Sequence, residues 1–160
     1  MTTEKPASEV AHTLSIDRVL DAPLDNVWRC WTEPNLLKQW FCPKPWYVSE
    51  ARMDPRSGGE FFTVMNGPNG ERFDNPGLFL AIEPKKRLVF TDSLKPDWLP
   101  TSRPFMVAEV IFEDLGNGKT RYAGYARHWN EETMREHEAM GFHDGWNKAA
   151  DQLEELARSL

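Results

Sequence analysis

Four side chains in this sequence could act as an acid or a base: Asp92, Tyr122, His128 and His143. An imidazole or a carboxyl group transfers protons near neutral pH when its surroundings adjust its pKa. His128 ends a strand-like stretch, where it is either a polar anchor or acid–base group facing a cavity, or a strand-end histidine that is hydrogen-bonded or solvated. No nucleophile elbow or glycine-rich phosphate loop accompanies these residues. The sequence therefore leaves the catalytic residues unassigned.

Metal-binding and redox motifs are also incomplete. The run from His137 to Gly141 nearly spells the His-Glu-x-x-His motif of zinc proteases, but Gly141 stands where the second histidine is required. His143 follows His137 by six positions, which places the two on different sides of a helix. Cys30 and Cys42 form no Cys-x-x-Cys pair, and we interpret Cys30 as a buried thiol. We expect neither a metal nor a cofactor.

Size and composition indicate one domain that neither binds nucleic acid nor inserts into a membrane. The chain has 160 residues, enough to bury a core, and a formal net charge of −6, which disfavours binding to phosphates. No apolar run approaches the roughly 18 residues of a membrane helix. The N-terminal residues lack the apolar stretch of a signal peptide, so we expect a cytoplasmic protein. Seven tryptophans and nine phenylalanines suit either a well-filled core or a cavity walled by aromatic rings.

The C-terminal segment, residues 130–160, carries the strongest periodicity. Apolar side chains recur there at three- and four-residue steps, as on one face of an amphipathic helix: Ala139, Phe142, Trp146, Ala149, Leu153, Leu156 and Leu160. Asn130 is a suitable N-cap. An unbroken helix over residues 131–159 would span roughly 40 Å, and Gly141 and Gly145 would allow a kink. Such a helix requires a broad partner surface.

The residues before this segment predict the partner surface. Residues 1–9 are polar and are expected to form a disordered tail, which leaves 10–160 as a single domain. Alternating apolar residues and turn signals predict strands over 10–20, 46–53, 60–65, 71–82, 87–92, 105–113 and 119–128. Two short helices are expected after the first strand, around Trp28 and over 36–41. Asn75-Pro76-Gly77 predicts a bulge within 71–82, and the loop 93–104 is expected to be mobile or lid-like.

These elements predict an α+β helix-grip fold. Strands joined by tight turns form antiparallel sheets, and a sheet of this size curls and must cover one face. We therefore expect a curved antiparallel sheet of six or seven strands around a long C-terminal helix, with the two short helices closing one end.

Strand alternation indicates which side chains would line a cavity under the helix. Gly124 and Ala126 share one face of the last strand, and their small size would leave room, so we expect this face to point inward. Glu109 then points outward on the paired strand and is expected to be solvated. For each wall candidate, core packing is the alternative to ligand contact. The candidates are Phe61, Phe79, Phe90, Trp98, Met106, Ala108, Tyr122, Gly124, Ala126, His128 and Met140.

Several local strings occur in an order that resembles one known family. They are Arg18 to Phe41, Gly58-Gly59-Glu60-Phe61, Met65 to Gly70, Glu83 to Phe90, Gly118 to Arg121, and Gly145-Trp146. Together they span nearly the whole chain and resemble the Bet v 1-like (START-like, SRPBCC) superfamily. Within it, the chain is similar to the branch named after the activator of Hsp90 ATPase, the AHSA1-like proteins. The resemblance implies a helix-grip fold with an apolar pocket between sheet and helix.

Three functions are compatible with these observations. The first is the binding of a small hydrophobic molecule, lipid- or polyketide-like, in the cavity under the terminal helix. The second is a cyclase or dehydratase that acts on a hydrophobic substrate in the same cavity, as in some relatives of the superfamily. The third is a stress-related module that interacts with a chaperone or a regulatory protein. Fold alone does not choose between them.

Overall fold

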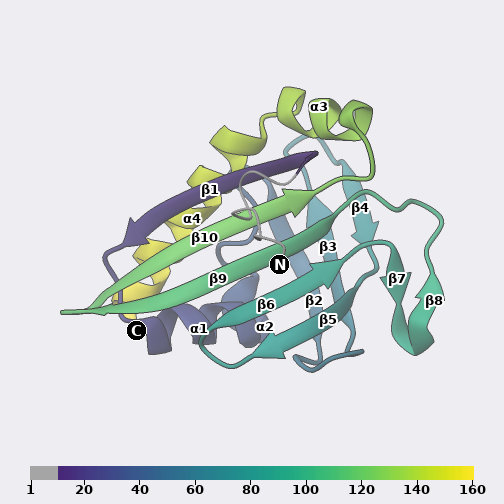
Figure 1. Cartoon of the computed structure of the whole chain (residues 1–160). Coiled ribbons are helices and arrows are strands. Elements are labelled where there is room, and N and C mark those ends of the chain that lie inside the picture. Colours follow the sequence, from purple (N-terminus) through teal and green to yellow (C-terminus); the bar gives the residue numbers. More distant parts are fainter. Residues whose placement is uncertain (1–10) are drawn as a thin grey trace.

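The computed structural model describes residues 11–160, in which a large antiparallel sheet and a smaller one behind it are packed with helices (Figure 1). The predicted tail at 1–9 lies outside the described residues. The strands are β1 (Thr13–Leu20), β2 (Tyr47–Met53), β3 (Phe61–Asn66), β4 (Arg72–Asn75), β5 (Leu78–Glu83), β6 (Arg87–Thr91), β7 (Leu94–Lys95), β8 (Leu99–Pro100), β9 (Val107–Gly116) and β10 (Lys119–Arg127). The helices are α1 (Leu24–Thr32), α2 (Pro34–Leu37), η2 (Pro96–Trp98), α3 (Glu131–Ala139) and α4 (Phe142–Ser159).

Antiparallel pairing builds two main sheets, in the orders β1-β10-β9-β6-β5 and β2-β3-β4. They meet at Gly77, whose carbonyl accepts a hydrogen bond from the Phe61 N–H at 3.1 Å. A Cβ at Gly77 would lie 2.8 Å from the Phe61 carbonyl oxygen, so only glycine fits this close backbone approach. The strand predicted over 71–82 is therefore β4 and β5, which break at Pro76-Gly77 and join the two sheets. The predicted α+β fold with a large antiparallel sheet is confirmed.

The C-terminal segment forms two helices that break at Gly141, one of the two glycines at which the sequence allowed a kink, so an unbroken helix over residues 131–159 is not formed. The Asn130 side chain caps α3 by accepting from the Thr133 N–H at 2.9 Å. Gly141, with φ at 95°, then takes the left-handed conformation that ends one helix and allows the next to start in a new direction. Gly145 stays inside α4 without interrupting it.

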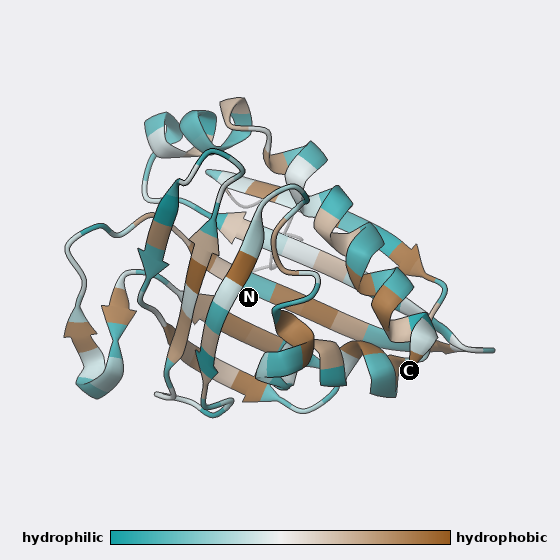
Figure 2. Ribbon diagram, turned by 180° about the vertical axis from the view of Figure 1, so that it is seen from behind, coloured by the Kyte–Doolittle hydropathy of each residue, from teal (hydrophilic) through white to brown (hydrophobic). Residues whose placement is uncertain are grey.

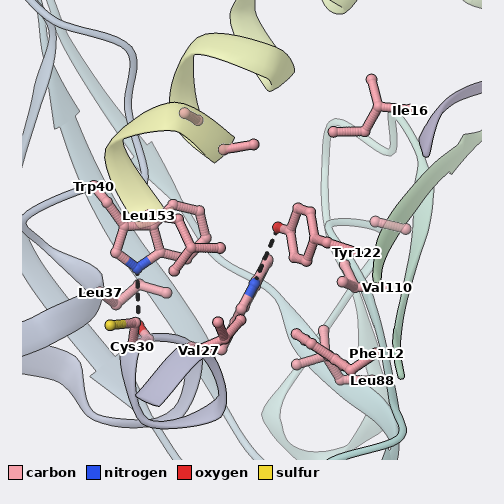
Figure 3. Packing of buried hydrophobic residues seen from close by; sticks show 14 of the residues in the cluster. Ile16, Val27, Cys30, Leu37, Trp40, Leu88, Val110, Phe112, Tyr122 and Leu153 are labelled. Atoms are coloured by element: carbon pink, nitrogen blue, oxygen red, sulfur yellow. Dashed lines mark hydrogen bonds between the residues drawn. The ribbon is translucent and has the colours of Figure 1, made fainter. Parts of the chain in front are cut away.

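The helix α4 lies on the inner side of the sheet, as Figure 2 shows from behind. Its apolar stripe buries Leu153 and Ala157 completely, and Figure 3 shows Leu153 pointing toward Val27 and Trp40. Polar contacts fix the helix on both sides. Arg18 of β1 pairs with Asp151 at 2.7 Å, and the Gln152 amide donates to the carbonyls that follow α2, of Trp40 and Cys42, at 2.9 and 2.7 Å.

The loop predicted over 93–104 contains the small β7–β8 hairpin. Its base is held by the Thr101 N–H, which donates to the Ser93 carbonyl at 3.0 Å. Trp98 lies at the tip with 55% of its surface exposed, against Gly58 of the β2–β3 turn.

Glu109 is on the outer face of the sheet, as predicted, but it is not solvated. Its carboxylate is paired with Arg87 of β6 and, at 2.9 Å, with Arg127 of β10. Burial alone would raise the pKa of Glu109, but the two guanidinium groups outweigh it and lower the pKa. The ion pairs therefore connect three neighbouring strands on the outside of the sheet.

Candidate ligand-binding site

A cavity of about 460 Å³ lies between the sheet and the C-terminal helices. It follows that α4 occupies the hollow of the sheet without filling it. Met140 is among the lining residues and is 75% exposed, so the cavity reaches the surface beside the α3–α4 junction. The lining residues come from every layer of the fold: Ile16, Trp31, Trp40, Phe41, Cys42, Pro43, Phe61, Thr63, Met65, Asn75, Pro76, Gly77, Phe90, Thr91, Asp92, Phe105, Met106, Tyr122, His137, Met140, Gly141, Phe142, Gly145, Trp146 and Ala149.

Aromatic rings in mutual contact form much of the wall. The Phe41 ring lies edge-on to Trp31 and to Phe61, with centroids 5.6 Å apart in both cases. Trp31 in turn lies 5.0 Å from Trp40, whose indole N–H donates to the Cys30 carbonyl at 2.9 Å (Figure 3). Edge-to-face contacts and hydrogen-bonded indoles restrict ring rotation. The wall is therefore apolar and largely pre-formed.

The structure separates the predicted wall residues into three groups. Phe61, Phe90, Met106, Tyr122 and Met140 line the cavity; that they contact a ligand stays a prediction. The side chains of Phe79, Ala108 and Ala126 lie in the packed core instead. Gly124 lies against the Trp146 ring, and Trp98 and His128 are not among the lining residues either.

The face of β10 that carries Gly124 does meet α4, but the room that this glycine leaves is occupied. A Cβ at Gly124 would lie 3.1 Å from the Trp146 ring of α4. The small residue thus permits close packing of helix on strand rather than open volume. The open volume lies further toward β3 and β6, under Gly145 and Ala149.

Tyr122 and Trp31 are joined by a buried hydrogen bond in which the Trp31 indole N–H donates to the Tyr122 hydroxyl at 3.1 Å. In Figure 3 this bond is the dashed line that ends on the hydroxyl of Tyr122. Burial raises the pKa of Tyr122, so its hydroxyl stays protonated at neutral pH.

Replacing Tyr122 by Phe should lower the free energy of unfolding by about 1–2 kcal/mol, because the buried indole N–H of Trp31 loses its acceptor. Urea denaturation of wild type and variant measures this difference. Tyr125→Phe is the matched control, since Tyr125 is also buried on β10 but its hydroxyl has no hydrogen-bond partner in residues 11–160. Equal costs for the two variants would contradict the assignment.

A polar cluster gathers at one end of the cavity around the peptide groups of Phe105. The Phe105 N–H donates to the Asp92 carboxylate at 2.8 Å. The Phe105 carbonyl oxygen lies 2.9 Å from His128 Nδ1, and His128 Nε2 lies 2.9 Å from His137 Nδ1. The end of β6, the start of β9, the end of β10 and helix α3 thus converge here.

Burial shifts the titration of this cluster. It lowers the pKa of His137 to about 4, helped by the neighbouring His128, and it also lowers the pKa of His128. It raises the pKa of Asp92 against the opposing effect of the N–H donors from Met106 and Phe105. Of the four acid–base candidates, Asp92 and Tyr122 line the cavity. His128 belongs to the polar cluster without lining the cavity, and His143 is exposed on α4.

The lowered pKa values predict acid sensitivity. Unfolded histidine binds a proton near pH 6.5, whereas folded His137 does so only near pH 4, so the unfolded state binds more protons in between. The contribution of His137 to the free energy of unfolding should therefore be largest above pH 6.5 and should fall as the pH drops toward 4. In His137→Phe this slope should be shallower, as measured by urea denaturation at several pH values. An unchanged slope would refute the contribution of His137.

Sequence reasoning missed several residues of this site. Trp31, Trp40 and Phe41 line the cavity but are not among the predicted wall residues, although helical spacing and aromatic richness are signals that could have found them. His137 was weighed only as a zinc ligand. Its pairing with His128 depends on the turn at Asn130, which folds α3 back over the end of β10, and no local pattern reports that contact.

Comparison with known proteins agrees with this architecture. The family model described as "Activator of Hsp90 ATPase homolog 1-like protein" matches residues 21–158, nearly all of the described chain. The chain belongs to the AHSA1-like family. No curated protein sequence matches it. Within residues 11–160, no helix has the length and apolar character needed to cross a membrane.

Several solved structures match this chain over most of their own length. A crystal structure of a protein from Nitrosomonas europaea is 43% identical, covers 93% of this chain and 96% of its own, and superposes with a TM-score of 0.89. A protein from Arthrobacter aurescens is 25% identical, covers 99% of this chain and 92% of its own, and superposes with a TM-score of 0.80. The AHSA1-like protein from Aeromonas hydrophila shares the fold, with a TM-score of 0.69 over 92% of each chain at 21% sequence identity.

Proposed function

We propose that this AHSA1-like protein binds a small hydrophobic molecule in the cavity between the sheet and α4. The observation that carries the proposal is the cavity of about 460 Å³, walled by contacting aromatic rings and open beside Met140. Volumes of this size are typical of sites for drug-sized ligands. A cytoplasmic setting stays a prediction from the sequence.

The energetics are adequate for reversible binding. Each Å² of apolar surface removed from water contributes roughly 25 cal/mol, so a ligand that buries about 200 Å² gains roughly 5 kcal/mol before the costs of association. Because the rings of Trp31, Phe41 and Phe61 already hold one another in place, little ordering of the wall is needed when the ligand enters.

Native mass spectrometry of the protein purified from the cells that produce it tests this proposal. We expect a bound mass that organic extraction releases and that belongs to an apolar compound. The matched sample is the Gly145→Trp variant, whose new side chain occupies the cavity and which should carry no such mass. Absence of the adduct in wild type, together with no binding of added naphthalene up to its solubility limit, would overturn the proposal.

A protein-interaction role is the second candidate, and the family description favours it because it names an activator of the Hsp90 ATPase. The direct assay is the ATPase rate of purified Hsp90 with and without this protein. Stimulation that persists in Gly145→Trp would assign the activity to an outer surface. No change in the rate at a large excess of the protein would remove this candidate.

A further inference from the structure

The polar cluster at Phe105 gives the cavity one end with a defined hydrogen-bonding character. The protons can be placed from the partners, because a carbonyl oxygen only accepts. The Phe105 carbonyl faces His128 Nδ1, so Nδ1 carries the proton and Nε2 of a neutral His128 accepts. His137 Nδ1 must then donate to His128 Nε2, which leaves His137 Nε2 as a bare acceptor.

This bare nitrogen is accessible. His137 lines the cavity, and its Nε2 has no hydrogen-bond partner in the part of the chain that the structure describes. Every fully buried side-chain nitrogen and oxygen among residues 11–160 does have a partner. His137 Nε2 therefore keeps some exposed surface on a residue that lines the cavity.

The second acceptor comes from Asp92. Its Oδ1 receives both backbone donors, from Phe105 at 2.8 Å and Met106 at 3.0 Å. By the same reasoning Oδ2, which has no partner among the described residues, is also accessible, and Asp92 lines the cavity. The polar end thus has two acceptor atoms that are not fully buried, both on residues that line the cavity.

We propose that the ligand is an apolar molecule with a neutral hydrogen-bond donor, such as a phenol or an alcohol, which donates to His137 Nε2. A carboxylate is disfavoured, because the Nε2 of a neutral His137 offers it no proton. This inference rests on the proposed function and narrows its ligand class. His128 is a positioning residue, since its hydrogen bond to His137 fixes which nitrogen faces the ligand.

One added proton on the His128–His137 pair would change the preferred ligand group from a hydrogen-bond donor to an acceptor. Whichever histidine takes the charge, His128 Nδ1 still donates to Phe105, and His137 Nε2 becomes an N–H donor. The other titratable groups on the cavity wall are Asp92, Cys42 and Tyr122. Burial raises the pKa of Cys42 to about 11 and also raises that of Tyr122, so both stay neutral near pH 7. Because the pKa values of both histidines are lowered, the His128–His137 pair is neutral near pH 7, and His137 Nε2 is a hydrogen-bond acceptor.

Three probes of matched shape test the inference at pH 7: naphthalene, 2-naphthol and 2-naphthoate, titrated into the full chain by NMR. We expect 2-naphthol to bind about five-fold more tightly than naphthalene, the effect of one net hydrogen bond, and 2-naphthoate to bind most weakly. In His137→Phe the advantage of 2-naphthol should vanish while naphthalene still binds. His143→Phe, at an exposed histidine of α4, is the control and should keep the advantage.

A second measurement needs no variant. The imidazole ¹⁵N shifts of wild type should show His137 Nε2 without a proton at pH 7, and that signal should move when 2-naphthol is added but not with naphthalene. Equal binding of 2-naphthol and naphthalene, tighter binding of 2-naphthoate, or a protonated Nε2 would overturn the inference and leave the cavity function standing. Failure of all three probes to bind would instead contradict the proposed function.

Discussion

Gly145→Trp is expected to weaken the binding of naphthalene by more than about ten-fold, which corresponds to about 1.4 kcal/mol. Gly145 faces the cavity from α4, and a Cβ there would meet nothing closer than Pro43, at 4.0 Å. A large ring at this position can therefore enter the volume that the ligand needs without a clash in the core. Fluorescence or NMR titration with naphthalene measures the loss.

Gly145→Ala is the matched control for this experiment. It adds a single methyl group, so naphthalene should still bind, and it should stabilise α4 by up to about 1 kcal/mol because alanine is the better helix former. Gly124→Trp would be a poor substitute, since Trp146 already occupies the space above Gly124. Unchanged naphthalene affinity in Gly145→Trp, with the fold intact, would place the binding elsewhere.

Leu153→Ala is expected to lower the free energy of unfolding by roughly 3 kcal/mol. Leu153 is fully buried where α4 meets α1 and the segment after α2 (Figure 3). Its truncation removes apolar contacts and leaves a cavity that the surrounding aromatic residues cannot easily fill. Urea denaturation with an unchanged m-value would report this cost as a shift of the midpoint.

The control for Leu153→Ala is Glu155→Ala, two positions along the same helix but exposed. It should change the free energy of unfolding by no more than about 0.5 kcal/mol. If Leu153→Ala costs less than about 1 kcal/mol, α4 does not dock into the hollow of the sheet as described.

The order of elements could be predicted from the sequence because turn residues and apolar periods are local signals. The β9–β10 hairpin, for example, turns at Asn117-Gly118, both with positive φ, as such a pair predicts. The break at Gly141 could not be fixed, since a glycine inside a helical pattern either continues the helix, as Gly145 does, or ends it. Tertiary contacts decide between the two.

The site was less predictable for the same reason. The strand period identified the face that carries Tyr122, which does line the cavity. It could not say where along that face volume stays open, because the position of Trp146 over Gly124 depends on how α4 is placed. The His128–His137 pair likewise arises from the packing of α3 against the end of β10, which no single stretch of sequence encodes.

The measurement that tests the central claim most directly uses the methionine methyl groups. Met65, Met106 and Met140 line the cavity, whereas Met53 and Met134 do not. In protein labelled at these methyls and saturated with naphthalene, we predict intermolecular NOEs from the probe to Met65, Met106 and Met140. NOEs to Met53 or Met134 alone, or none at saturation, would contradict the claim that the space under α4 holds the ligand.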